Sequence, residues 1–234
     1  MVNKELLQDH LVSIIMATLN AEKYLKNALE SIKEQSYKNY EVLIVDGGSS
    51  DDTIEIASSF AKVRIINQKG KGLFDAWNEG ITSSSGEYIA LLDSDDFWEK
   101  DALFEHMNAL LSEPNLLGSV GRMNFLLEKG QTPPAEFKMS LLNESHLAYM
   151  PGCFVGKKEI FDKLGLFETH WKIASDIVWF AKVKELQDGI VLLNSVVLNK
   201  RVHNKNLSYS AAKSDTYSKE LLTLLHNKLN QRKS

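Results

Sequence analysis

Three aspartates within four residues, Asp93, Asp95 and Asp96, form the densest group of chemically active side chains in the sequence, here called the acidic cluster. They follow an apolar run at 88–92 that predicts a buried strand. Side chains two positions apart in an extended segment point the same way, so Asp93 and Asp95 can face one ligand together. Carboxylates this close repel each other, and a hard cation such as Mg2+ or Mn2+ relieves the repulsion. The pattern therefore fits a metal that links protein to a diphosphate, and it equally fits a solvated turn before a helix.

The elements that must position this cluster alternate between strand and helix in the first half of the chain. Short apolar runs predict four strands, at 12–17, 41–45, 63–66 and 88–92. Apolar residues at helical spacing predict helices over about 24–32, 51–60, 73–81 and 103–111. This alternation predicts an α/β fold, a Rossmann-like α/β/α arrangement with a mostly parallel central sheet.

Polar side chains stand where three of the predicted strands end. Asn20 follows the first strand, where it is also expected to cap the next helix. Asp46 ends the second strand, and the acidic cluster follows the fourth. Because ligands of parallel α/β sheets bind beyond the carboxyl ends of the strands, we expect these side chains to gather at one rim.

The second half of the chain is less regular. Its predicted segments are a loop at 131–136, a helix at 159–164 stopped by Gly165, a helix capped by Ser175, a strand at 191–198 and a terminal helix at 221–229. No linker is evident, so we expect a single domain over 1–234. Its expected parts are a donor half at about 11–98, an acceptor half at about 115–210 and a C-terminal helix at 213–234.

Composition narrows the class of protein. The chain has 234 residues, 44% of them hydrophobic, and a net charge of −4, which argues against a general nucleic-acid binder. Cys153 is the only cysteine, so neither an intrachain disulfide nor a cysteine zinc site is expected. The first ten residues lack a signal-peptide core, and no apolar run approaches the roughly 20 residues that span a bilayer. We therefore expect a cytoplasmic protein, soluble or peripheral at the membrane.

Four segments in order resemble the successive signatures of the family 2 glycosyltransferases. They read VSIIMATLN, IVDGGSSDDT, KGLFDAWNEGI and GEYIALLDSDD, and a looser similarity continues through GLFE and ASDIVWF. The resemblance implies a GT-A fold and an inverting transferase. Such an enzyme moves a sugar from a nucleotide-diphosphate sugar to an acceptor hydroxyl, in cell-surface polysaccharide or glycolipid synthesis, with Mn2+ or Mg2+ as cofactor.

The resemblance also assigns roles to the acidic residues. It makes Asp95 the main metal ligand, places Asp93 nearer the ribose, and gives Asp96 an assisting part. Asp176, in ASDIVWF, matches the base that takes the proton from the acceptor hydroxyl. Taken without the resemblance, Asp176 is an ordinary acidic residue at a helix start, where the helix dipole favours it.

Further positions are expected at the donor and acceptor sites. The donor-binding candidates are Thr18, Asn20, Asp46, Lys71, Asp75, Asn78, Asp93, Ser94 and Arg201. His203 is a candidate metal ligand or phosphate contact, and Trp171 a candidate platform for an acceptor sugar; structural roles are the alternative for both. Gly47 stands where many relatives carry a second acidic residue, in a form similar to exopolysaccharide and colanic-acid-type transferases. This departure leaves the donor base open.

Two other functions are consistent with parts of the pattern. A nucleotidyltransferase would carry a glycine-rich basic loop after the first strand, where this chain has ATLNAEKYL. A non-catalytic nucleotide-sugar-binding protein would keep the acidic cluster but need no base. The expected partners are the donor and a glycan or lipid-linked acceptor. The leucines and lysines at 217–233 fit peripheral membrane contact, a dimer contact or ordinary packing.

Overall fold

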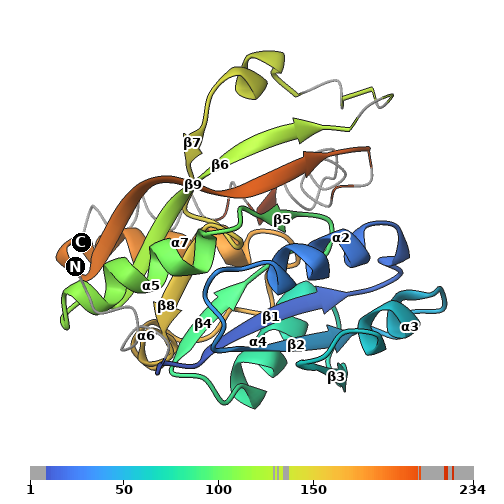
Figure 1. Ribbon diagram of the computed structural model, residues 1–234, viewed down its shortest axis with the longest axis horizontal. Helices are drawn as coiled ribbons and strands as arrows, with labels where there is room; N and C mark the ends of the chain where they lie inside the picture. Colours follow the sequence, from blue (N-terminus) through green and yellow to red (C-terminus); the bar gives the residue numbers. More distant parts are fainter. Residues whose placement is uncertain are drawn as a thin grey trace.

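The computed structural model describes residues 9–128, 130, 132–133, 137–204, 206, 219–220 and 223 (Figure 1). Its strands form one sheet in the order β3-β2-β1-β4-β8-β6-β9-β5, with β7 paired to β6. The strands are β1 Val12–Thr18, β2 Tyr40–Asp46, β3 Val63–Asn67, β4 Tyr88–Leu91, β5 Phe97–Trp98, β6 Gly118–Leu127, β7 His146–Leu147, β8 Phe154–Lys157 and β9 Ile190–Val202. The helices are α2 Glu22–Lys33, α3 Thr53–Ser58, α4 Leu73–Ser83, α5 Ala102–Ser112, α6 Glu159–Leu164 and α7 Ser175–Glu185, with short 3-10 turns η1 Met139–Asn143 and η2 Gln187–Gly189.

The four strands predicted in the first half are parallel neighbours, β3-β2-β1-β4. In the register of β1 with β2, Thr18 lies opposite Asp46, so both strands end at the same level. The predicted α/β fold with a mostly parallel sheet is confirmed. Strand β8 runs antiparallel to both β4 and β6, and the short strands β5 and β7 are antiparallel to β9 and β6.

Helices cover both faces of the sheet, because residues along each strand point alternately to opposite sides. Ile14 and Met16 of β1 pack on one face with apolar residues of α2 and α5. Ile15 packs on the other with Trp77 of α4 and Trp179 of α7. Figure 1 shows these helices as outer layers, while β6, η1 and β7 extend as a separate projection at the top of the view.

A glycine allows α4 to approach the sheet closely. A Cβ added to Gly80 would lie 2.3 Å from Cγ2 of Ile15 and 3.3 Å from Cγ2 of Val45. No side chain fits there without displacing the buried strand residues. The approach holds α4, and the loop before it, against the carboxyl ends of β1 and β2.

Several predicted boundaries need correction. Asn20 does not cap α2, which begins at Glu22; Ala21 holds the cap position and makes no side-chain cap bond. Ser175 is the first residue of α7 and not its cap, since Ala174 holds that position. The helix predicted at 51–60 is confined to Thr53–Ser58. Most of the predicted loop at 131–136 and of the C-terminal helix lies outside the described residues.

The N-terminal residues of α2 and α3 bond to each other, which replaces the side-chain cap that Ala21 does not provide. The amide of Ala21 donates to Oγ1 of Thr53 at 2.7 Å, and the amide of Glu22 donates to Oδ2 of Asp51 at 3.2 Å. Unpaired amides at a helix start need such partners. The exchange fixes the loop after β1 against the loop after β2.

Candidate active site

Asp46 organises the loop that follows β2. Its Oδ2 accepts the amides of Gly48 at 2.9 Å and Ser49 at 2.8 Å, and its Oδ1 accepts the hydroxyls of Thr18 at 2.9 Å and Ser49 at 2.5 Å. Burial alone would raise the pKa of Asp46, but these hydrogen bonds outweigh it and lower the pKa. The carboxylate is 5% exposed, so its oxygens are occupied by the protein itself.

Asn20 joins the loops after β1 and β2. It has a positive φ of 51°, a conformation that asparagine tolerates better than most residues. Its side-chain Oδ1 accepts the backbone amide of Ser50 at 2.9 Å, and its backbone amide donates to Oγ of Ser49 at 2.9 Å. Asn20, Thr18 and Asp46 therefore lie together at the rim, as the strand ends predict.

The acidic cluster lies on the turn after β4. Each of its three carboxylates offers an oxygen within 4.8 Å of the other two. The amide of Asp96 donates to the carbonyl of Asp93 at 3.2 Å, which closes the turn. Ser94 is half-buried between them. This spacing suits a small divalent cation held by carboxylate oxygens.

Lys200, near the end of β9, reaches into the acidic cluster. Its Nζ lies 3.0 Å from Oδ2 of Asp96 and 3.6 Å from Oδ2 of Asp93, and its side chain is 14% exposed. Burial raises the pKa of Asp96 to about 7, the charges of Asp95 and Asp93 add to the rise, and Lys200 opposes it. Burial would lower the pKa of Lys200, but the three carboxylates raise it above its ordinary value. The lysine is thus a fixed cation inside the cluster.

Asp96 is occupied on both oxygens. Its Oδ2 binds Lys200, and its Oδ1 accepts the amide of Arg201 at 2.8 Å. It is 2% exposed, whereas Asp93 and Asp95 are half-buried. Of the three carboxylates, Asp96 is therefore the one committed to the protein. Asp93 and Asp95 are the two that remain accessible to a ligand.

Asp95 faces two groups that follow β9. His203 Nε2 and Asn206 Nδ2 each lie 3.0 Å from its Oδ2. Burial would raise the pKa of Asp95, but the hydrogen bond with His203 and the charge of Lys200 lower it. The ring of His203 stacks on that of Tyr24 with centroids 4.9 Å apart. The predicted proximity of His203 to the acidic cluster is present in the structure.

Arg201 lies beside the cluster but is engaged with the protein. Its Nε donates to the carbonyl of Asp95 at 2.9 Å, and another guanidinium nitrogen bonds to the side chain of Asn27. The guanidinium also lies 5.0 Å from the ring centroids of Tyr24 and Phe97. A contact with pyrophosphate would have to share this guanidinium with Asn27.

Asp176, on the first turn of α7, comes from a different part of the chain. Burial raises the pKa of Asp176 to about 6, a 2.8 Å bond from the amide of Ile177 opposes the rise, and the charge of Asp93 adds to it. A carboxyl group with a pKa near neutrality, beside a candidate metal site, is suited to take up a proton.

The other predicted positions have distinct surroundings. Lys71 is exposed, and its amide donates to Oδ2 of Asp75 at 3.0 Å. The side-chain amide of Asn78 makes two bonds to the backbone of Phe167. Its Nδ2 donates to the carbonyl at 2.8 Å, and its Oδ1 accepts the backbone amide at 3.0 Å. Trp171 is 9% exposed and donates to Glu168 at 3.1 Å, which leaves little of its ring open for stacking.

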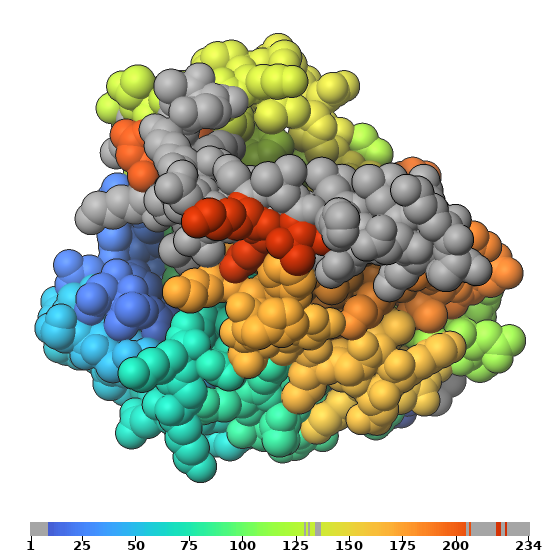
Figure 2. Space-filling view, turned by 180° about the vertical axis from the view of Figure 1, so that it is seen from behind, coloured from blue at the N-terminus to red at the C-terminus, as the bar shows by residue number. Residues whose placement is uncertain are grey.

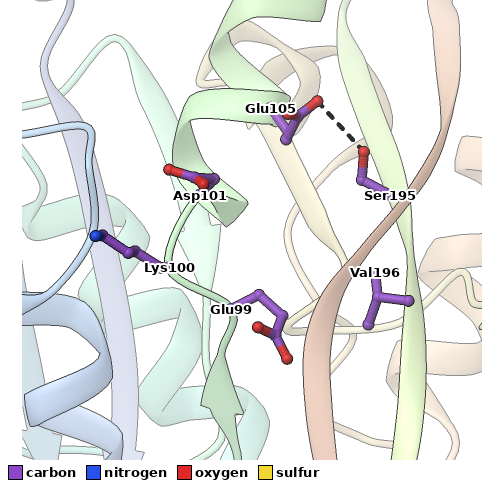
Figure 3. Close-up of a pocket in the computed structure, with 6 residues that line it drawn as sticks. All are labelled: Glu99, Lys100, Asp101, Glu105, Ser195 and Val196. Carbon is purple, nitrogen blue, oxygen red and sulfur yellow. Dashed lines mark hydrogen bonds between the residues drawn. The ribbon is translucent and has the colours of Figure 1, made fainter.

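A separate cleft lies at the start of α5 and the middle of β9 (Figure 3). Its lining residues are Glu99, Lys100, Asp101, Glu105, Ser195 and Val196. None of the site residues predicted from the sequence lines it. Thr18, Asn20 and Asp46 lie instead at the carboxyl ends of β1 and β2, and the acidic cluster after β4 contacts Arg201 and His203 at the end of β9.

Sequence reasoning did not identify three residues that surround the acidic cluster: Lys200, Asn206 and Tyr24. Lys200 directly precedes Arg201, so the same NKRVH stretch carried the signal. A lysine near a strand end is ordinarily solvated, and nothing local connects it with Asp96. The free thiol of Cys153 is fully buried, and burial raises its pKa.

Comparison with known proteins decides the family. Residues 13–165 match the model of a family described as glycosyl transferase family 2. The chain belongs to this family. EpsH of Bacillus subtilis, a protein named as a glycosyltransferase, is 31% identical over 150 residues, which are 62% of this chain and 43% of EpsH. The glucosyltransferase WfgD of Escherichia coli is 38% identical over 109 residues, 45% of this chain and 43% of WfgD.

The fold agrees with this family. Glucosyl-3-phosphoglycerate synthase of Mycobacterium tuberculosis, solved with Mn2+, uridine diphosphate and glucosyl-3-phosphoglycerate, aligns with a TM-score of 0.64 at 18% identity. The alignment covers 94% of this chain and 82% of that one. The expected GT-A fold of the family 2 glycosyltransferases is confirmed, and the matched segments span less than half of EpsH and of WfgD. In the described part, no helix has the length and apolarity to cross a membrane.

Proposed function

We propose that the chain is an inverting, metal-dependent glycosyltransferase that transfers a sugar from a nucleotide-diphosphate sugar to an acceptor hydroxyl. One combination of features carries the proposal: Asp93 and Asp95 form a candidate metal site, and the charge of Asp93 adds to the rise that burial gives the pKa of Asp176, to about 6. Nucleotide-sugar binding alone gives no reason for a buried carboxyl group poised near neutrality beside a metal site. This arrangement favours an enzyme over a binding protein.

Asp93 and Asp95 would hold Mn2+ or Mg2+, with His203 next to Asp95 as a further nitrogen ligand or as a partner that orients it. The oxygen-rich donor set fits either ion. When bound, the metal would neutralise the diphosphate as it leaves the sugar. Asp96, predicted as an assisting ligand, instead anchors Lys200 and the amide of Arg201, so its proposed role is to shape the site.

Asp176 is the proposed base. Its carboxylate would accept the proton of the acceptor hydroxyl while that oxygen bonds to the anomeric carbon and the bond from carbon to the diphosphate oxygen breaks. Attack from the side opposite the leaving group inverts the configuration. A base with a pKa of about 6 is ionised at neutral pH and remains able to take up a proton.

The remaining donor contacts follow from position. Thr18, Asn20 and Asp46 would form the wall beside the nucleoside through the loops they hold together. Lys71, Asp75, Ser94 and Arg201 are the proposed contacts on the phosphate and sugar side. Asn78 is reassigned to holding the backbone of Phe167 against α4. We propose that Trp171 contacts the acceptor through the edge of its ring.

We propose that the acceptor is a glycan or is lipid-linked. The half of the chain after about residue 115 would bind this acceptor, and residues 11–98 would bind the donor. The name of WfgD gives an acceptor linked to diphosphoundecaprenol, which supports this class. An acceptor of that kind would bring the protein to the cytoplasmic face of a membrane as a peripheral protein. The single-domain organisation over 1–234 belongs to the same proposal.

A donor screen tests the function. Thermal stability would be measured with UDP-glucose, UDP-N-acetylglucosamine and GDP-mannose, each with and without Mn2+, together with release of the nucleoside diphosphate. We expect one donor to stabilise the protein only with metal present, and to be turned over. Asp176→Asn should keep this stabilisation and lose turnover. Stabilisation without turnover in the unsubstituted protein would instead indicate a nucleotide-sugar-binding protein.

A further inference from the structure

The N-terminus of α7 lacks a cap of its own, although it carries the proposed base. Ala174 holds the cap position, and its side chain cannot accept a hydrogen bond. Backbone amides at the start of a helix need acceptors, and the helix dipole favours a negative charge there. Within the first turn Asp176 itself accepts the amide of Ile177 at 2.8 Å, so an acceptor from elsewhere in the chain can act on the segment that leads into the helix.

Glu220 supplies that acceptor from the C-terminal part of the chain. Its Oε1 accepts the amide of Lys172 at 2.8 Å, and its Oε2 accepts the amides of Ile173 at 3.1 Å and Ala174 at 3.0 Å. One carboxylate thus binds three successive backbone amides, 46 to 48 residues earlier in the sequence. Figure 2 shows the described C-terminal residues, in red, lying against the orange surface of this region.

The other side of the same loop is held independently. Glu168 accepts Lys182 Nζ at 3.0 Å and Trp171 Nε1 at 3.1 Å, which ties the start of the loop to the side of α7. Glu220 holds the end of the loop, where the chain enters the helix. Asp176 follows Ala174 by two residues, so the place of its carboxylate depends on how firmly this entry is held.

We infer that Glu220 is a positioning residue for the proposed base, fixing the entry of α7 so that Asp176 meets the acceptor hydroxyl. The inference rests on the proposed function. It assigns the C-terminal part of the chain a share in the active site, although its residues lie outside the segment that matches the family model. Glu220 acts in this role through its bonds to the backbone amides of residues 172–174.

The test compares Glu220→Gln with Lys219→Gln, a change at the neighbouring exposed position. Glutamine keeps the size of the side chain but removes the charge and one acceptor oxygen. We expect hydrogen exchange at the amides of 172–174 to become about ten-fold faster in Glu220→Gln. We expect kcat for release of nucleoside diphosphate from the donor that the screen identifies to fall about 10- to 100-fold, with donor KM and Mn2+-dependent stabilisation unchanged. Lys219→Gln should change none of these.

A double variant separates positioning from general stability. If Glu220 acts through the base, Glu220→Gln should reduce turnover no further when Asp176→Asn is already present. Unchanged kcat in Glu220→Gln, or a fall matched by a general increase in exchange across the chain, would overturn the inference. Absence of turnover and of metal-dependent stabilisation in the unsubstituted protein would overturn the proposed function, and this inference with it.

Discussion

Replacing Lys200 by methionine tests the idea that a fixed cation balances the acidic cluster. The substitution keeps the apolar stem but removes the charge 3.0 Å from Asp96 and 3.6 Å from Asp93. At an effective dielectric constant of about 20, these two attractions are roughly 5 kcal/mol each before the cost of burial is subtracted. Removing one partner of a buried ion pair typically costs about 3–5 kcal/mol, which is the loss of unfolding free energy that we expect at pH 8.

The loss should depend on pH, and its sign follows from Asp96. The folded pKa of Asp96, about 7, is above its ordinary 3.8, so the folded protein binds this proton more tightly than the unfolded chain. Stability from this group falls as pH rises from about 4 to 7. Without Lys200 the pKa rises further, and the fall continues to higher pH. Between pH 6 and 8 the folded variant binds on average about half a proton more than the folded unsubstituted protein. Its deficit in unfolding free energy should therefore be about 1.4 kcal/mol larger at pH 8 than at pH 6.

The assay is urea unfolding of the metal-free protein at pH 6 and pH 8, with Lys100→Met as control. Lys100 is exposed, so its replacement should change the unfolding free energy by less than about 0.5 kcal/mol. Adding Mn2+ should stabilise Lys200→Met more than the unsubstituted protein, because a second cation then takes up the uncompensated charge. A deficit below about 1 kcal/mol at pH 8, or one that does not change with pH, would refute the reasoning.

Three further predictions concern the base, the loop after β2 and the close approach of α4. Turnover should rise with pH through about 6 and then level off as Asp176 ionises, and Asp176→Asn should lower kcat by about 100- to 10,000-fold at pH 7.5 in the nucleoside diphosphate assay. Asp46→Asn should lower the unfolding free energy in urea by about 2 kcal/mol, since an amide nitrogen would replace one of two oxygens that each accept two hydrogen bonds, and the negative charge would be lost. Gly80→Ala should cost about 1–3 kcal/mol by the same measurement, and this cost should be smaller when Ile15→Ala is already present, because that change removes the Cγ2 and Cγ1 atoms that the new Cβ would meet.

The first half of the fold was predictable because its signals are local. Runs such as the one at 41–45 are apolar throughout, and each is followed by helical spacing, so strand, helix and parallel order follow from neighbouring residues. The rim at Asn20, Asp46 and Asp93 then follows from topology alone. The cap predicted for Asn20 was wrong because the loop after β2 uses its side chain.

The second half depends on partners far away in the sequence. Strand β6 contains two glycines, and Gly121 packs against Val197 of β9, a contact that no local pattern indicates. Strand β8 is only four residues long and is defined by its antiparallel pairing with β4 and β6. These elements were therefore missed.

In the site, too, the sequence motifs identify residues but not the distant partners that determine their roles. The motif identified Asn78, but its pairing with Phe167 appears only once α4 and the segment after α6 are folded together. Lys200 meets Asp96 across 104 residues, and Glu220 meets Ala174 across 46. Charge balance and loop anchoring of this kind are properties of the assembled chain.

We propose that Asp93 and Asp95 hold a divalent cation against the diphosphate of the donor, and manganese can be located directly in crystals. Crystals of the protein grown with Mn2+ and the nucleoside diphosphate of the donor identified in the screen would be measured at a wavelength that reveals manganese by anomalous scattering. We expect a single strong peak in contact with a carboxylate oxygen of Asp95 and a phosphate oxygen, on the side of the acidic cluster that faces Asp176. A nucleotide bound at the rim with manganese elsewhere, or with no manganese near Asp95, would contradict the account.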